Sequence, residues 1–156
     1  MNDYIFKQYK DMVYRIIGAA MQVHSELRWG LQEAVYNESL QLELLDNGIE
    51  AKSEEPIQCH YKHHLLEKQY KMDLVVGEVI VELKSVQDIV PAHRAQLFNY
   101  LRLTHRPIGL LINFGDTYLQ GERYGYIEET NECVLLDKNM NILRENIDWS
   151  SDESLK

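Results

Sequence analysis

The chain has 156 residues, of which 45% are hydrophobic and 26% are charged, as in an ordinary globular protein with one sizeable core. Its net charge of −9 argues against broad, nonspecific nucleic-acid binding, because attraction to phosphates normally requires a basic surface. No run approaches the ~18 apolar residues of a membrane span.

Apolar residues at helical spacing predict a first helix over about 4–27, which Trp29-Gly30 interrupts. A second helix follows over about 32–46, with Asn47-Gly48 as its stop signal. The next segments have the β-branched and apolar content of strands, over about 49–61, 65–76 and 79–86.

Pro91 suits the first turn of a helix that we expect to continue to about Leu103. Residues 107–114 form a nearly all-apolar run, which predicts an interior strand. After Gly115 the pattern is irregular, with one further strand expected at 133–137 and a polar tail over 150–156.

The two cysteines and the first residues bear on the cellular compartment. Cys59 and Cys133 are far apart and match no zinc-site spacing. Residues 1–7 lack the basic stretch and apolar core of a signal peptide. We therefore expect reduced thiols in a cytoplasmic protein, organised as one domain over residues 1–156.

Three charged residues interrupt the apolar strands on either side of the two-residue turn Gly77-Glu78. Glu82 and Lys84 share one face of their strand, and Asp73 lies on the neighbouring strand. Two carboxylates and one amine among buried aliphatic residues are costly unless a metal or substrate compensates them, which is typical of a metal-dependent phosphodiesterase. The alternative is a surface hairpin with a cross-strand charge pair.

The chain resembles the GxxExxY proteins, a bacterial group placed in the PD-(D/E)xK nuclease superfamily. The resemblance covers about residues 10–115, and the blocks that carry it are Ile16–Ala20 with Val23-His24, Gly30–Tyr36 with the naming motif, Asp73 with Glu82-Leu83-Lys84, Gln96–Leu101 and Gly109–Gly115. Residues 116–149 are left as a C-terminal extension. Two departures are Arg28-Trp29-Gly30, where the family has Gly-Pro-Gly, and Met72, where the superfamily has its proline.

The resemblance implies a metal-dependent site. Asp73 and Glu82, helped by the Leu83 carbonyl, would hold Mg²⁺ or Mn²⁺. Lys84 would orient the attacking water or stabilise developing charge. The resemblance also favours Glu33 as an extra acidic group near the metal. The alternative is that Glu33 is a helix-start residue whose carboxylate favours the helix dipole. By analogy with the exonuclease-like branch, His24 is a metal-ligand candidate, against the alternative of a packed histidine.

The helix after the third strand carries the candidates for substrate contact. Gln96 and Tyr100 are four residues apart, and His93 falls on the same helical face. This Gln-x-x-x-Tyr pair resembles the substrate-contacting motif of the exonuclease-like branch. Arg94 would position phosphates, and it belongs to the sustained basic stretch between Ile89 and Gly115. The alternative is a solvated polar face.

The resemblance implies a restriction-endonuclease-like α/β core, with a mixed central sheet flanked by helices in the order ααβββαβ. The expected function is metal-dependent hydrolysis of nucleic-acid phosphodiester bonds, with DNA favoured over RNA. One alternative is a non-catalytic interaction or nucleic-acid-holding module, which docks a protein partner through its acidic surface. Another is a metal-dependent hydrolase of nucleotides or short oligomers, which fits the low basicity. A homodimer would let so small a nuclease engage both strands of a nucleic-acid duplex. No membrane role is expected.

Overall fold

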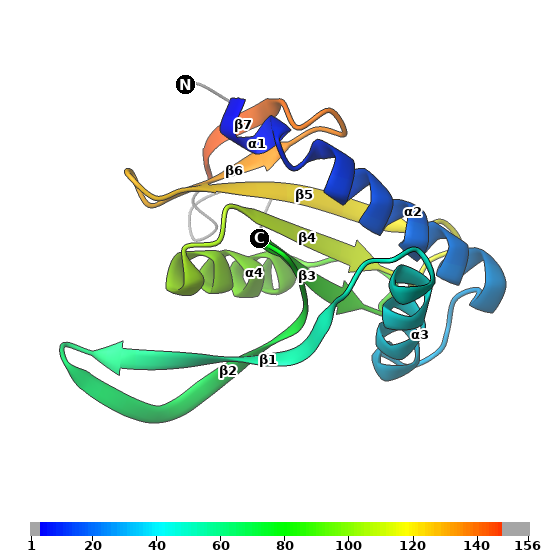
Figure 1. The fold of residues 1–156 in the computed structure, drawn as a ribbon, viewed down its shortest axis with the longest axis horizontal. Coiled ribbons are helices and arrows are strands. Elements are labelled where there is room, and N and C mark those ends of the chain that lie inside the picture. Colours follow the sequence, from blue (N-terminus) through cyan, green and yellow to red (C-terminus); the bar gives the residue numbers. More distant parts are fainter. Residues whose placement is uncertain (1–3, 148–156) are drawn as a thin grey trace.

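The structure, a computed structural model, describes residues 4–147 (Figure 1). The helices are α1 (Tyr4–Lys7), α2 (Lys10–Leu27), α3 (Glu33–Asp46) and α4 (Pro91–Thr104). The strands are β1 (Lys52–Tyr61), β2 (His64–Val76), β3 (Val79–Lys84), β4 (Ile108–Asn113), β5 (Gln120–Ile127), β6 (Glu132–Leu136) and β7 (Ile142–Ile147). No helix in this described part of the chain is long and apolar enough to cross a membrane.

Over residues 4–147 the strands form one seven-stranded sheet in the chain order β1 to β7. All neighbouring strands are antiparallel except β3 and β4, which run parallel. A parallel pair needs a crossover connection, and α4 supplies it. The expected mixed sheet flanked by helices is therefore confirmed.

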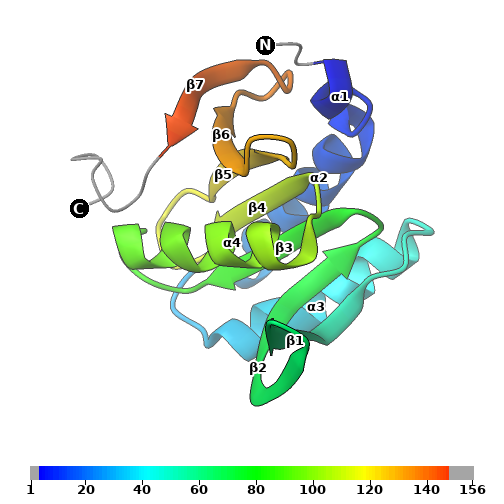
Figure 2. The same cartoon turned by 90° about the vertical axis from the view of Figure 1, so that its left-hand side faces the viewer.

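Helices cover both faces of the sheet. Figure 2 shows α4 on one side and α2 on the other. Alternation along β3 divides its side chains between the two layers, since Val81 and Leu83 join the core under α2 and α3 and Ile80 joins the core under α4. Glu82 has the same parity as Ile80, so it lies on the α4 face.

The structure corrects the expectation that the chain is irregular after Gly115. Residues 120–127 form β5 and residues 142–147 form β7, which extend the same sheet. Gly121 and Gly125 weaken the strand pattern of β5. They are useful in the fold because a Cβ at Gly125 would lie 2.6 Å from the Phe6 ring, so helix α1 packs directly on this strand. The predicted first helix is also interrupted between α1 and α2, and the polar tail at 150–156 lies outside the described residues.

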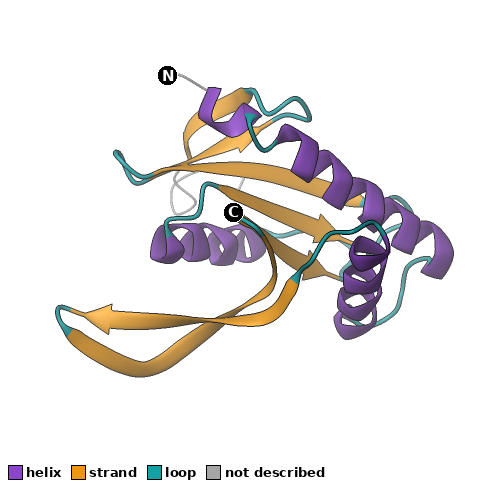
Figure 3. Cartoon of the chain, viewed as in Figure 1, coloured by secondary structure: helices purple, strands orange, loops and turns teal. Residues whose placement is uncertain are grey.

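The β1–β2 hairpin extends beyond the rest of the sheet (Figures 1 and 3). Strand β3 pairs with β2 only along Leu74–Val76, whereas β1 pairs with β2 down to the turn at Tyr61↔His64. The side chains of residues 64–71 are exposed. We call residues 57–71 the hairpin arm.

Candidate active site

Asp73, Glu82 and Lys84 lie where strands β2 and β3 diverge. The backbone ladder between these strands ends at Leu74↔Val81. One step further, the Leu83 amide donates to Oδ2 of Asp73 at 2.8 Å, so a carboxylate takes the place of a backbone acceptor. The Asp73 amide in turn donates to Oε1 of Glu82 at 3.4 Å. The strand geometry thus brings both carboxyl groups together on adjacent strands.

The electrostatics of this pair are those of a site short of positive charge. Glu82 is only 2% exposed. Burial, together with a side-chain hydrogen bond and charge interaction with the Asp73 carboxyl group, raises the pKa of Glu82 to about 10, and the Asp73 amide and Lys84 oppose this shift only in part. Without a further cation, Glu82 therefore keeps its proton at neutral pH.

The residues present fit Mg²⁺ or Mn²⁺ by the chemistry of their donors. Both ions prefer oxygen ligands, and a divalent cation would compensate the two carboxylates. Residues 4–147 contain no group of three or more His, Cys, Asp or Glu side chains that would hold a metal.

Helix α4 carries three predicted substrate-contacting residues, and Gln96 and Tyr100 are linked to Lys84 by hydrogen bonds. The Lys84 Nζ atom donates to Oε1 of Gln96 at 3.5 Å, and Nε2 of Gln96 donates to the Tyr100 hydroxyl at 3.0 Å. Burial and the Glu82 charge raise the pKa of Tyr100 to about 12, so it stays a neutral phenol. Burial, then Lys84 and Arg94, lower the pKa of His93, whose Nδ1 accepts a hydrogen bond from the Val90 amide.

Arg94 is turned toward strand β5. Its guanidinium donates two hydrogen bonds to the carboxylate of Glu122, at 2.8 and 2.9 Å. The other arginines of the same basic stretch also contact the fold, since Arg106 donates to the Gly77 carbonyl and Arg102 to the Asn131 carbonyl. The charge of this stretch is therefore largely engaged within the protein.

His24 and Glu33 lie on the helices of the opposite layer. His24 is 8% exposed, and its Nε2 is 2.8 Å from the Asp116 carbonyl oxygen, which ties α2 to the loop after β4. Glu33 is exposed at the first turn of α3. The segment before it reaches the end of β3, where the Ser85 hydroxyl donates to the Leu31 carbonyl. Neither residue has a contact with Asp73 or Glu82 that would assign it to the site.

Two residues of the Gly30–Tyr36 motif have clear structural roles. Gly30 adopts a φ of +99°, which residues other than glycine rarely adopt. Tyr36 is fully buried, stacks on Phe114 with ring centroids 4.6 Å apart, and donates its hydroxyl proton to the Arg28 carbonyl. Glu33 is exposed, as are Leu31 and Val35 of the same motif.

Two residues that are not among the candidates from the sequence hold the backbone near Asp73 and Lys84. Asn37 donates to the Asp73 carbonyl at 3.3 Å and so holds the backbone of that strand. Asn113 is fully buried, and its amide contacts both the nitrogen and the carbonyl of Val86 at 3.0 and 2.9 Å. These contacts fix the segment that follows Lys84. The signal for Asn113 was a single amide at the end of an otherwise apolar run.

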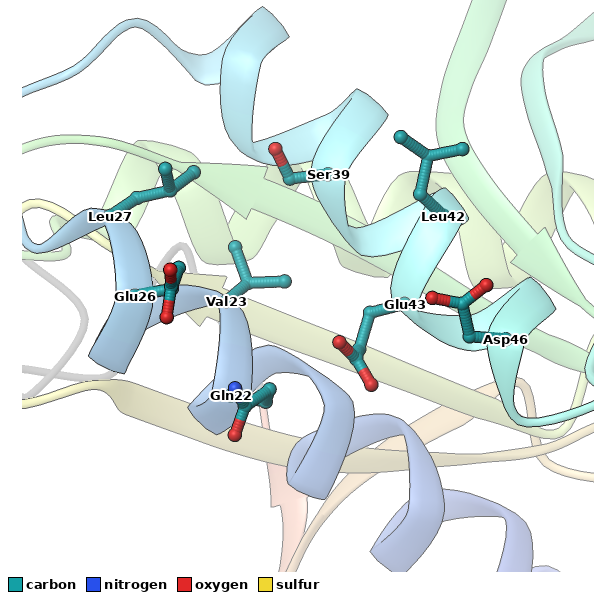
Figure 4. Close-up of a pocket in the computed structure, with 8 residues that line it drawn as sticks. All are labelled: Gln22, Val23, Glu26, Leu27, Ser39, Leu42, Glu43 and Asp46. Atoms are coloured by element: carbon teal, nitrogen blue, oxygen red, sulfur yellow. The ribbon is translucent and has the colours of Figure 1, made fainter.

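A separate groove of about 280 Å³ lies between α2 and α3 (Figure 4). Its lining includes the acidic residues Glu26, Glu43 and Asp46. None of the lining residues is Asp73, Glu82 or Lys84, so this groove is distinct from the carboxylate site.

Comparisons with known proteins show the fold and the superfamily of this chain. A solved protein named SSO0001 shares the fold, with a TM-score of 0.50 and 15% sequence identity over 80% of this chain and 63% of that one. No functionally curated protein is similar enough to count as a match. The mixed sheet with helices on both faces is a restriction-endonuclease-like fold. Residues 10–124 match the sequence profile of the PD-(D/E)XK nuclease superfamily, and the chain therefore belongs to that superfamily.

Proposed function

We propose that this chain is a Mg²⁺- or Mn²⁺-dependent nuclease of the GxxExxY group, which hydrolyses nucleic-acid phosphodiester bonds and prefers DNA to RNA. The observation that carries the proposal is the convergence of Asp73, Glu82 and Lys84 at the divergence of β2 and β3. The match to the superfamily over residues 10–124 supports the reaction class.

Asp73, Glu82 and the Leu83 carbonyl would hold the ion, since they offer hard oxygen donors at one strand end. An ion bound there supplies Lewis-acid polarisation of the phosphate and lowers the pKa of a bound water. The proposal keeps Glu33 as an additional acidic group and His24 as a further ligand candidate. For His24 the nitrogen left for a metal is Nδ1, because Nε2 contacts the Asp116 carbonyl.

Lys84 would orient the attacking water and stabilise negative charge on the phosphate. Gln96 positions it by accepting a hydrogen bond from its ammonium group. The pKa of Tyr100 is raised and that of His93 is lowered, and both shifts favour the neutral side chain. As neutral groups, both residues would donate hydrogen bonds to the substrate backbone. Arg94 remains a candidate phosphate contact, although it would have to exchange Glu122 for phosphate.

A second candidate function is hydrolysis of nucleotides or short oligomers. The net charge of −9 and the engagement of Arg94 and Arg106 within the fold favour a small substrate over a long duplex. The interaction-module alternative is less favoured, because the complete Asp73, Glu82 and Lys84 set is retained. A bacterial source, a cytoplasmic location, a protein partner and a homodimer stay predictions.

The test is Mn²⁺-dependent cleavage of single-stranded DNA, duplex DNA, RNA and dinucleotides by wild type, Asp73→Asn and Lys84→Ala. Loss of turnover by at least about 100-fold in both variants, with an unchanged circular dichroism spectrum, supports the site. Lys138→Ala is the matched control, since Lys138 is an exposed lysine between β6 and β7. Full cleavage by either site variant would place the chemistry elsewhere.

A further inference from the structure

The hairpin arm carries positive charge in an otherwise acidic protein. Residues 57–71 contain Lys62, Lys68 and Lys71 against one acidic residue, Glu67, while the whole chain has a net charge of −9. The arm also exposes aromatic rings, with Tyr61 at 62% and Tyr70 at 40% exposure. A basic element with exposed tyrosines has the composition of a surface that holds nucleic acid through phosphates and stacked bases.

One face of the arm leads to the carboxylate site through a row of adjacent side chains. The Lys68 ammonium lies 5.2 Å from the centre of the Tyr70 ring, and the Tyr70 and Tyr100 rings have centroids 5.9 Å apart. Tyr100 then contacts Gln96, which contacts Lys84. Both views place the arm beside α4 (Figures 1 and 2). A nucleic-acid strand that lies along this row of side chains would reach the candidate active site.

We infer that the Lys68–Tyr70 face of the hairpin arm binds an unpaired nucleic-acid segment next to the bond to be cleaved. This inference rests on the proposed function, to which it adds the substrate class and the element that holds it. A base stacked on Tyr70 replaces the weaker exposed contact with Lys68, which frees the ammonium for a phosphate. Duplex DNA keeps its bases inside the helix and has none to offer to Tyr70.

The arm lysines suit such a substrate better than they suit a long duplex. Two cations of the basic stretch, Arg94 and Arg106, are less available for phosphates because they are engaged within the fold. Stacking on Tyr70 adds affinity that does not depend on charge, which matters in a protein of net charge −9. The arm therefore reconciles nucleic-acid binding with an acidic chain.

The experiment measures the fluorescence anisotropy of a short labelled oligothymidylate and of a blunt DNA duplex, in EDTA so that neither is cut. The wild-type protein should bind the oligothymidylate more tightly than the duplex. Tyr70→Ala should weaken that binding by about 5- to 100-fold, and Tyr70→Trp should restore it. Lys68→Ala should lower the slope of log affinity against log salt by about 0.7, the value for one phosphate contact on a single strand.

The matched controls are Tyr14→Ala, an exposed tyrosine on α2, and Lys138→Ala, and both should bind as wild type does. If the wild type cleaves nucleic acid but the arm variants bind and cleave unchanged, the inference fails and the proposed function stands. If wild type neither binds nor cleaves any substrate, both fail. A change of oligomeric state in sedimentation of the Tyr70 or Lys68 variants, with oligonucleotide affinity unchanged, would make the arm a self-association element and overturn the inference.

Discussion

The Glu82 carboxyl group lies against Asp73 of the neighbouring strand, with its Oε1 atom 3.4 Å from the Asp73 amide nitrogen. Burial and the neighbouring carboxylate raise the pKa of Glu82 from 4.5 to about 10. At neutral pH the folded protein without metal therefore binds a proton at Glu82 that the unfolded chain does not bind. Folding stability is linked to this proton, and the metal binding proposed at this pair would be linked to it as well.

The first prediction concerns stability. Because folding raises the pKa of Glu82, its contribution to stability is complete below about pH 4.5 and is lost as pH rises toward about 10. Glu82→Gln removes the need for proton uptake, so it should raise the free energy of unfolding by about 1–3 kcal/mol near pH 7 and by little near pH 4.5. Urea unfolding in EDTA across this pH range measures the difference.

Glu67→Gln, which neutralises an exposed carboxylate on the hairpin arm, is the control and should leave the pH dependence unchanged. A Glu82→Gln curve that runs parallel to wild type at every pH would show that Glu82 ionises normally in the folded protein.

The second prediction concerns metal binding. An ion held by Asp73 and Glu82 requires the ionised form of Glu82, so Mn²⁺ binding near pH 7 should release about one proton and strengthen as pH rises. Calorimetry in buffers of different ionisation enthalpy counts that proton. The release should vanish in Glu82→Gln. Mn²⁺ binding that is independent of pH and persists in Asp73→Asn with Glu82→Gln would locate the ion elsewhere.

The parts of the site that were predictable from sequence depend on local periodicity. Alternation along β3 correctly places Glu82 on the face opposite Leu83, and helical spacing correctly groups Gln96 with Tyr100. The predicted helix over Pro91 to about Leu103 is likewise close to the observed α4. These relationships follow from a residue's own strand or helix, so the sequence is enough to infer them.

The remaining features depend on partners far away in the chain. Arg94 faces Glu122, 28 residues later, and Asp73 is held by Asn37, 36 residues earlier. Strand β5 was missed because its glycines have low strand propensity, although Gly125 is suited to the close approach of Phe6. Pairing between distant segments leaves no periodic signal in either segment.

The third prediction separates two roles of Arg94. If it mainly holds β5 to α4 through Glu122, Arg94→Met should lower the free energy of unfolding by about 1.5–3 kcal/mol, as expected for hydrogen bonds between charged groups. Glu122→Gln should lose part of the same energy, and the double variant should lose less than the sum. Chemical denaturation of the four proteins measures this coupling. A stable Arg94→Met protein with a reduced salt dependence of oligonucleotide binding would instead assign Arg94 to phosphate contact.

The fourth prediction distinguishes the two side chains of the motif around α3. Tyr36→Phe removes the hydroxyl that donates to the Arg28 carbonyl and accepts from the Leu31 amide, so it should cost about 1–3 kcal/mol of stability. Glu33 is exposed, and Glu33→Gln should cost less than about 1 kcal/mol, the range of a helix-dipole contribution.

Cleavage should respond in the reverse order, because a group that supports a metal site typically contributes about 10- to 100-fold to activity or affinity. We therefore expect Glu33→Gln to lower Mn²⁺-dependent cleavage by that factor at a temperature where both variants are folded, and Tyr36→Phe to lower it less. Thermal unfolding and cleavage measured on the same preparations provide the comparison. If Glu33→Gln cleaves as wild type does, Glu33 acts only as the acidic first-turn residue of α3, where its carboxylate favours the helix dipole.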